Sequence, residues 1–338
     1  MFDESKNYYF VTPVLPYAED GTIDENQYRG LLRKFLEPRY IEAGMALIAN
    51  PEAGEVFYLD RAEKRRTVEI AVEEAGGRVP VFAGVIDTTT AGTVAVAEDA
   101  ARAGADGLFV MPPIGALDVS SSWNADAYPE VFIDMLQAIT AAVDLPMIVH
   151  PTSSPSARYG IGIPAHATRK IIEAVPQIVG WKMTYNYDGY REITRTLRSL
   201  DRPVAIFGAA AVYFHENLAT GDFDGTVTGS WNYAQEAMFD HIQAWNGGDL
   251  DTARKVWNGG LSQLQEYVYS DYSRIHIRYK TACWLRGIID SPVMRAPMPR
   301  PLREEVETLI RLLSAAGLSI IDETATNVYT GEKVVVAG

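Results

Sequence analysis

The residue that could most clearly take part in catalysis is Lys182, which ends the short β-type segment Ile178–Lys182. Strand alternation places Lys182 on the same face as Gly180 and on the face opposite to Trp181. If this strand belongs to a barrel and the lysine points inward, desolvation lowers the pKa of its ammonium group. A neutral amine is what a carbonyl substrate needs to form a Schiff base. The alternative is a buried lysine paired with a carboxylate for structural reasons only.

Two further ionisable residues follow apolar runs of the same kind. His150 ends the run Pro146–His150, and Glu52 lies in the loop Pro51–Glu55 directly after another run. Imidazole has an unperturbed pKa of about 6.5 and can move protons near neutral pH. Glu52 is a candidate acid or base. Packing alone would also explain a buried histidine, and backbone amides could hold the loop carboxylate.

The elements that must position these residues are eight short apolar runs, most of them apolar throughout, as strands buried on both faces are. The runs are Tyr8–Thr12, Met45–Asn50, Pro80–Val85, Asp106–Met111, Pro146–His150, Ile178–Lys182, Val204–Gly208 and Asp224–Gly229. Helical patterns lie between them. Eight β-α repeats with right-handed crossovers predict an α/β protein with a (β/α)8 TIM barrel, whose active site lies at the C-terminal ends of the strands. An open doubly wound sheet is the second choice, but the first run leads into Pro13–Pro16 and not into a glycine-rich turn.

Capping residues set the expected helix ends in the barrel. Asp60 can cap a helix over residues 61–75, which Gly76 can end. Another helix is expected over residues 88–103. Pro164 suits the first turn of a helix that leads to Ala174.

After about residue 235 the strand pattern stops. Helices are expected at 234–245, 250–269, 274–289 and 302–316. We therefore expect a barrel over residues 1–235 and a C-terminal helical domain over residues 236–338. Residues 327–336 read as a hairpin or as an arm that reaches a neighbouring subunit.

Bulk composition restricts the class of protein. The chain has 338 residues, a net charge of −14 and a pI of about 4.9, which argues against binding to nucleic acid or to anionic membranes. An anionic small substrate remains compatible, because a cleft can carry its own sign. The single cysteine, Cys283, excludes an internal disulfide and is expected to pack in a helix. No signal peptide and no transmembrane run is recognisable, so we expect a soluble cytoplasmic protein.

An ordered set of motifs resembles one known family, over roughly residues 8 to 290. The motifs are Val11-Thr12-Pro13, Pro51-Glu52-Ala53-Gly54-Glu55, Arg78–Val85, Gly104–Pro112, Ile178–Lys182 and Gly225–Asn232. Together they are similar to those of the dihydrodipicolinate synthase and N-acetylneuraminate lyase family of class I aldolases. The resemblance implies a barrel with a C-terminal helical domain, usually assembled as a homotetramer. It also implies that Lys182 forms an imine with a 2-oxo acid, most often pyruvate.

The same resemblance implies which residues line the substrate pocket. These are Thr12, Ala53, Gly54, Gly208 and Val227, all at or near strand ends. Arg158, in Arg158-Tyr159-Gly160, is the counterpart of a family arginine that can bind a substrate carboxylate. An arginine fork suits that task, although a solvated loop arginine is an equal alternative.

The chain departs from the family where its proton relay and carboxylate pocket lie. His150 replaces the tyrosine of strand five, and Glu52 and Ala53 replace two threonines that hold the keto acid's carboxylate. Two like charges about 4 Å apart at an effective dielectric near 20 repel by about 4 kcal/mol. An ionised Glu52 would therefore oppose a substrate carboxylate unless it is protonated or turned away. The family's tyrosine after strand four is also missing, and Tyr185 is the nearest residue that could return a phenol to the site.

These observations predict a lyase of the class I type, acting as an aldolase or as a hydratase-aldolase or dehydratase. The catalytic candidates are Lys182, His150, Glu52 and Tyr185. The expected substrates are a 2-oxo acid and, in some reactions, an aldehyde, with no cofactor and no metal. Two alternatives remain open. One is a metal-assisted aldolase with His150 and Glu52 as ligands, and the other is a non-catalytic barrel that binds a metabolite.

Overall fold

Eight parallel strands close into a barrel in the computed structural model, which describes residues 6–113 and 123–321. Around the barrel the strands follow the order β1, β10, β9, β8, β5, β4, β3, β2. Their bounds are β1 (Tyr8–Val11), β2 (Met45–Ala49), β3 (Val81–Val85), β4 (Gly107–Val110), β5 (Met147–Val149), β8 (Ile178–Met183), β9 (Ala205–Gly208) and β10 (Gly225–Thr228). Each lies within or closely matches one of the eight predicted runs, so the predicted TIM barrel is confirmed.

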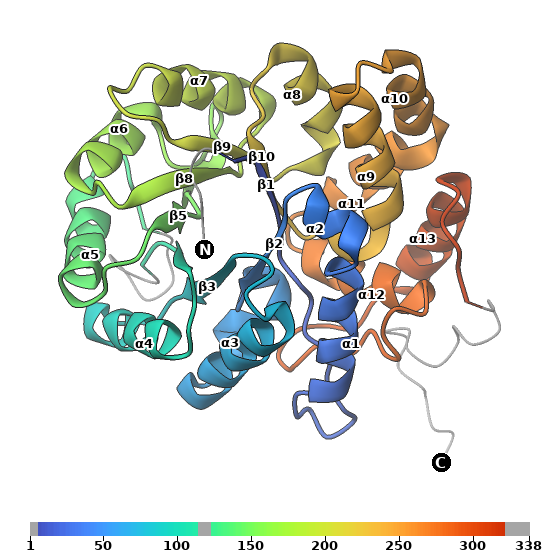
Figure 1. Ribbon diagram of the computed structural model, residues 1–338, viewed down its shortest axis with the longest axis horizontal. Helices are drawn as coiled ribbons and strands as arrows, with labels where there is room; N and C mark the ends of the chain where they lie inside the picture. The colour runs from blue at the N-terminus through green and yellow to red at the C-terminus, as the bar shows by residue number, and fades with distance from the viewer. Residues whose placement is uncertain (1–5, 114–122, 322–338) are drawn as a thin grey trace. The chain divides into compact units, whose positions relative to one another are not determined.

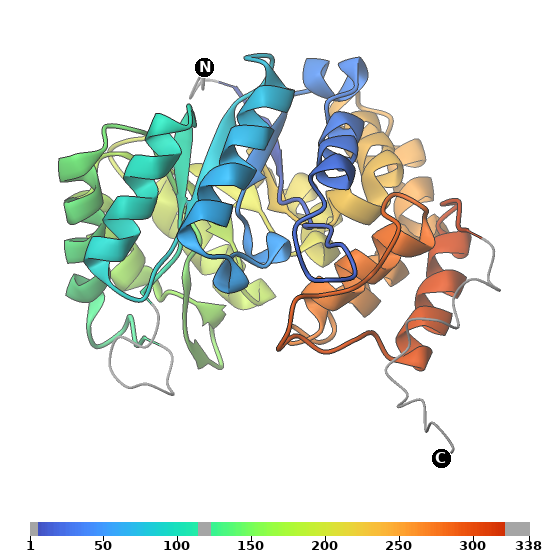
Figure 2. The same cartoon turned by 90° about the horizontal axis from the view of Figure 1, so that it is seen from below.

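Helices α3 to α8 surround these strands, as Figure 1 shows. Figure 2 shows α3 and α4 side by side along the strands. The helices of this unit are α2 (Pro38–Glu42), α3 (Arg61–Ala75), α4 (Thr90–Arg102), α5 (Pro129–Ala142), α6 (Ala165–Ala174), α7 (Tyr187–Arg198) and α8 (Phe214–Thr220). Short helical turns lie at η1 (Glu52–Gly54), η2 (Val56–Tyr58) and η3 (Ala211–Tyr213).

The predicted ends of α3 are confirmed, and its start is fixed by a capping box. The side chain of Asp60 accepts from the backbone N–H of Glu63, and the Glu63 carboxylate accepts from the N–H of Asp60. At the other end Gly76 adopts a left-handed conformation with φ of 54°. Pro164 differs from expectation, because it is the N-cap residue of α6 and precedes its first turn.

One element of the barrel unit was not predicted. After β5 the chain forms an antiparallel hairpin of β6 (Thr152–Ser156) and β7 (Gly160–Gly162). Its first strand is polar and contains Pro155, so it lacks the apolar alternation that indicates a strand. The hairpin leaves the C-terminal end of β5.

The barrel interior is filled by aromatic and aliphatic side chains from successive strands. The ring of Phe10 packs edge-on against Phe82 and Phe207, with centroids 5.0 and 5.6 Å away. A Cβ atom on Gly180 would lie only 2.4 Å from the ring of Phe207. The absence of a side chain at Gly180, two residues before Lys182 in the sequence, thus makes room for Phe207.

The chain divides into two compact units, and the second consists of residues 13–34 and 229–338. Among the described residues it is helical. Its helices are α1 (Glu25–Phe35), α9 (Trp231–Asn246), α10 (Leu250–Val256), η4 (Trp257–Leu261), α11 (Ser262–Tyr269), α12 (Ile275–Leu285) and α13 (Arg303–Ala315). The last residue of α1, Phe35, belongs to the barrel unit. Cys283 is buried in α12, as predicted.

The expected domain boundary at residue 235 falls inside α9, whereas the barrel unit of residues 1–12 and 35–228 ends at Thr228. The expected arm at 327–336 lies outside the described residues. None of the described helices has both the length and the apolar character needed to cross a membrane.

Candidate active site

The site is built on β8, which carries Lys182 near its C-terminal end, at the mouth of the barrel. Strand pairing places Lys182 beside Phe207 of β9. The side chain of Lys182 is 12% exposed. Its Nζ lies 5.4 Å from the ring centroid of Phe109, which comes from β4. The amine therefore sits at the top of the apolar barrel core, as its strand parity predicted.

One carboxylate oxygen joins the three leading candidates. Oε2 of Glu52 lies 3.4 Å from Nζ of Lys182 and 3.1 Å from Nδ1 of His150. The contact to Lys182 is a hydrogen bond. Nδ1 of His150 lies at ion-pair distance from this oxygen, but it makes no hydrogen bond among the described residues. The structure thus brings together Lys182, His150 and Glu52 from three different strands or their loops.

Burial controls the electrostatics of this group. The His150 side chain is only 3% exposed and that of Glu52 is 17% exposed. Burial lowers the pKa of the Lys182 ammonium below its usual value, and the Glu52 carboxylate opposes part of that shift. Burial also lowers the pKa of His150, again opposed by Glu52, while the charge of Lys182 lowers it further. The arrangement favours a neutral imidazole and eases loss of the lysine proton.

The loop after β2 turns sharply to present Glu52. Residues 52–54 form the turn η1, in which the N–H of Gly54 donates to the carbonyl of Pro51 at 3.0 Å and the N–H of Glu55 donates to that of Glu52 at 2.9 Å. Glu55 follows in a left-handed conformation with φ of 60° and is buried. A non-glycine residue in that conformation carries backbone strain, which is common at functional loops.

The predicted pocket residues are all buried, and they lie at or near the C-terminal ends of barrel strands. They are Thr12, Ala53, Gly54, Gly208 and Val227. Val227 belongs to the apolar core cluster. Gly208 has a packing role, since a Cβ there would lie 2.8 Å from Phe223 and 3.0 Å from Phe214. Their contact with a substrate stays a prediction.

Tyr185 is placed away from the lysine. Its hydroxyl accepts a hydrogen bond from Nε1 of Trp181 at 2.9 Å and donates to the carbonyl of Ile163 at 3.1 Å. Trp181 faces away from the barrel interior, opposite to Lys182. The phenol is therefore engaged in packing outside the barrel, and the structure does not bring it to Lys182.

Arg158 is also not brought into the group around Lys182. It lies in the turn of the β6–β7 hairpin, is 66% exposed and pairs with Glu192 of α7. It lines a shallow cavity of about 520 Å³ together with Ala157, Asp188, Arg191 and Arg195. Its binding to a substrate carboxylate stays a prediction.

Phe109 also lies at this site, although it was not among the residues predicted from the sequence. Its ring lies under the Lys182 amine and 5.6 Å from the His150 ring. Because Phe109 and Met111 share a strand face, alternation along the fourth run could have identified it as inward-facing. No group of three or more histidine, cysteine, aspartate or glutamate side chains able to hold a metal occurs within residues 6–113 and 123–321.

Comparison with known proteins gives one family. The model of the dihydrodipicolinate synthetase family matches residues 7–316. The 4-hydroxy-tetrahydrodipicolinate synthase of Nitratidesulfovibrio vulgaris (strain DP4) is 27% identical over 311 residues, covering 91% of this chain and 98% of the relative. A Streptomyces coelicolor protein, named "probable 5-dehydro-4-deoxyglucarate dehydratase 2", is 28% identical over 314 residues, covering 91% of this chain and 89% of the relative.

Solved structures agree on the fold. YagE of Escherichia coli K12, a member of this family crystallised with pyruvate, superposes with a TM-score of 0.77 at 20% identity, over 93% of this chain and 99% of that one. Dihydrodipicolinate synthase from Aquifex aeolicus gives a TM-score of 0.75 at 20% identity, over 94% and 100% of the two chains. At these identities the likeness supports the barrel architecture.

Proposed function

We propose that this chain, which belongs to the dihydrodipicolinate synthetase family, is a lyase in which Lys182 forms a Schiff base with a 2-oxo acid. The observation that carries the proposal is the shared carboxylate oxygen of Glu52, 3.4 Å from the Lys182 amine and 3.1 Å from the His150 ring. A nucleophilic amine, a carboxylate and an imidazole in one buried cluster are the groups that imine chemistry needs.

The first step is a proton transfer from Lys182 to Glu52. It leaves a neutral amine that can attack the C2 carbonyl and a neutral carboxyl that no longer repels a substrate carboxylate. The repulsion removed is about 4 kcal/mol for charges about 4 Å apart at an effective dielectric near 20. The altered loop is thereby compatible with a 2-oxo acid.

The following steps use the same proton. Attack of Nζ on C2 gives a carbinolamine, and the Glu52–His150 pair protonates its hydroxyl, which leaves as water. The resulting protonated imine withdraws electrons from C3. Loss of a proton from C3, or breakage of the C3–C4 bond with loss of the proton from a C4 hydroxyl, then gives an enamine. His150 and Glu52 are the groups in contact that can accept and return those protons.

The reaction class within this scheme is an aldol cleavage, an aldol addition or a dehydration. A synthase and a dehydratase are both among the relatives, at 27% and 28% identity. Dihydrodipicolinate synthesis is the less favoured of these, because His150 and Glu52 stand in place of the family's usual relay and carboxylate residues. The 2-oxo acid is the common element, and pyruvate is the natural first probe, since YagE was crystallised with it.

Borohydride trapping tests the proposal. The protein is incubated with pyruvate and a panel of longer 2-oxo acids, reduced, and analysed by intact mass and peptide mapping. We expect one added substrate per chain, located on Lys182 and absent in Lys182→Ala. Turnover of a 2-oxo acid without any adduct, or an adduct on another lysine, would contradict it.

We also propose that the protein acts in the cytoplasm, and that it assembles as a homotetramer, as the family resemblance implies. The acidic chain, with a net charge of −14, is consistent with a freely dissolved enzyme. Light scattering coupled to size exclusion measures the assembly, and a monomer at micromolar concentration would contradict this part of the proposal.

A further inference from the structure

We infer that Asn50 is a positioning residue for Glu52, and that it acts by fastening the loop after β2 to the first turns of α3. The inference rests on the proposed function, in which Glu52 carries the proton of Lys182. It concerns a residue that touches neither the amine nor the imidazole in the described structure.

Asn50 is buried and left-handed, with φ of 53°, directly before the loop that carries Glu52. Its amide nitrogen donates to the carbonyl of Lys64 at 2.7 Å. Its amide oxygen accepts from the hydroxyl of Thr67. Both partners lie on α3, and asparagine is the side chain that offers a donor and an acceptor while tolerating this backbone conformation.

The neighbouring strand β3 has a glycine where the backbone of Asn50 passes close to it. A Cβ atom on Gly84 of β3 would lie 1.8 Å from the carbonyl oxygen of Asn50, so the loop can cross β3 only where a glycine leaves space. Nearby, Nζ of Lys64 donates to the carbonyl of Ile86 at 3.1 Å, which ties the start of α3 to the end of β3. The loop is thus held from α3 and from β3.

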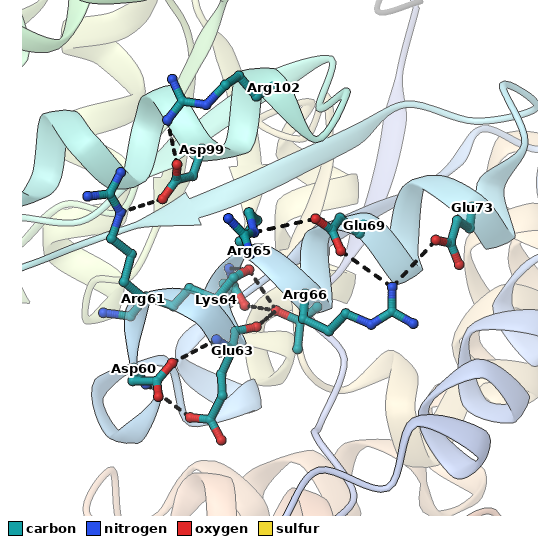
Figure 3. A network of polar contacts seen from close by, with 12 residues as sticks. Asp60, Arg61, Glu63, Lys64, Arg65, Arg66, Glu69, Glu73, Asp99 and Arg102 are labelled. Atoms are coloured by element: carbon teal, nitrogen blue, oxygen red, sulfur yellow. Dashed lines mark hydrogen bonds and ion pairs between the residues drawn. The ribbon is translucent and has the colours of Figure 1, made fainter.

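The start of α3 is itself fixed, as Figure 3 shows. Asp60 and Glu63 cap each other there, and Arg61 is bonded to Asp99 of α4.

Glu52 stands two residues after Asn50, and only Pro51 lies between them. A change in backbone direction at Asn50 therefore moves the Glu52 carboxylate, and a 1 Å misplacement in an active site can cost about 10²-fold in rate.

The experiment measures proton transfer separately from imine formation, with pyruvate as the probe. In D2O the pyruvate imine loses a C3 proton to the base and the enamine takes back a deuteron, so exchange at C3 is followed by NMR. Adduct formation at Lys182 is followed in parallel by borohydride trapping and mass spectrometry. The variants are Thr67→Val, Thr67→Ser, Asn50→Gly, Glu52→Gln and the double variant Thr67→Val with Glu52→Gln.

We expect Thr67→Val to slow C3 exchange by about 10- to 100-fold, because a shifted Glu52 carboxylate is misplaced for proton transfer. The Lys182 adduct should still form. Thr67→Ser keeps the hydroxyl and is expected to restore most of the rate. In the Glu52→Gln background Thr67→Val should add almost nothing, because a residue that acts through Glu52 has no effect once Glu52 is gone. Asn50→Gly accepts the positive φ and gives a second measurement if Thr67→Val folds poorly.

Thr194→Val is the matched control. Thr194 is a buried helical threonine of α7, and its hydroxyl has no hydrogen-bond partner among the described residues. We expect this variant to exchange pyruvate protons at the wild-type rate. The melting temperature of Thr194→Val, compared with that of the wild type, measures the purely structural effect of the same substitution.

Two outcomes would overturn the inference. One is a Thr67→Val protein that exchanges C3 protons at the wild-type rate, and the other is an equal loss from Thr67→Val in the wild-type and Glu52→Gln backgrounds. A wild-type protein that forms no Lys182 adduct with any 2-oxo acid is a different result, because it overturns the proposed function itself.

Discussion

At the scale of single residues, the charge of Glu52 has two opposing effects. It lies 3.4 Å from Lys182 and raises the amine's pKa against the larger lowering by burial. In the proposed mechanism the same carboxylate accepts the proton that the amine must lose. Its removal should therefore ease deprotonation of Lys182 and slow the later proton transfers.

Glu52→Gln should shift the pH midpoint of Lys182 adduct formation to lower pH. The sign follows because the charge of Glu52 and its hydrogen bond to Nζ both favour the ammonium, so their removal leaves burial to lower the pKa of Lys182. The measurement is the pH dependence of adduct formation with pyruvate by mass spectrometry. A midpoint that moves to higher pH would mean that Glu52 does not stabilise the ammonium.

His150 should make the folded protein sensitive to mild acid. Burial lowers its pKa from the usual 6.5, so below that pH the unfolded chain binds more protons than the folded one. The free energy of unfolding should then fall as pH drops below 6.5, by up to about 1.4 kcal/mol per pH unit. Denaturant unfolding at several pH values should show a flatter dependence for His150→Gln. A slope in His150→Gln that equals the wild-type slope would contradict this prediction.

At the scale of elements, α3 and α4 are joined by one buried carboxylate. Asp99 of α4 accepts from Arg61 of α3 and from Arg102 of its own helix, and its side chain is 9% exposed (Figure 3). The hydrogen bond from Arg61 is the main cause that lowers the pKa of Asp99, so this stability is present above the usual value of 3.8 and is lost in acid.

Asp99→Asn should lower the free energy of unfolding at pH 7 by about 1 kcal/mol, since the Arg61 partner is 55% exposed and solvent screens the pair. Glu98→Gln, which removes a 3.8 Å contact to the same Arg102, should cost less. Chemical denaturation of both variants measures the difference. Equal losses would show that Asp99 contributes no more than an exposed neighbour.

The strands and their inward residues could be predicted from the sequence because burial on both faces leaves continuous apolar runs. That pattern sufficed to place Lys182, His150 and Glu52 at one barrel mouth. Tyr185 was misplaced although a clue existed, since the alternation that turns Trp181 outward continues to residue 185. The β6–β7 hairpin was missed because its polar strand lacks periodicity, and the surroundings of Arg158 depend on that hairpin.

At the scale of the whole molecule, the net charge of −14 repels an anionic substrate at long range. The cavity beside the β6–β7 hairpin has the opposite local sign, because Arg158, Arg191 and Arg195 line it with Asp188. Both the hairpin and α7 leave from the C-terminal ends of barrel strands. We therefore expect this surface to assist the approach of an anion to the barrel mouth.

A triple variant with glutamine at 158, 191 and 195 should lower kcat/KM for a 2-oxo acid at low ionic strength and leave kcat unchanged. The difference from wild type should shrink in high salt, because the electrostatic screening length falls to about 3 Å at about 1 M. Steady-state kinetics across ionic strength measures it. A loss that persists in high salt would instead mean direct binding of the substrate by these arginines.

The joined pair of Glu52 and His150 also has a consequence for product handedness. Nδ1 of His150 and Nζ of Lys182 both lie close to one oxygen atom of Glu52. In the proposed mechanism, every proton that enters or leaves C3 therefore passes through this single cluster. An enamine is planar at C3 and can be protonated on either face. With one donor cluster the two faces are not equivalent, and a 2-oxo acid with a substituted C3 should leave this enzyme as a single stereoisomer.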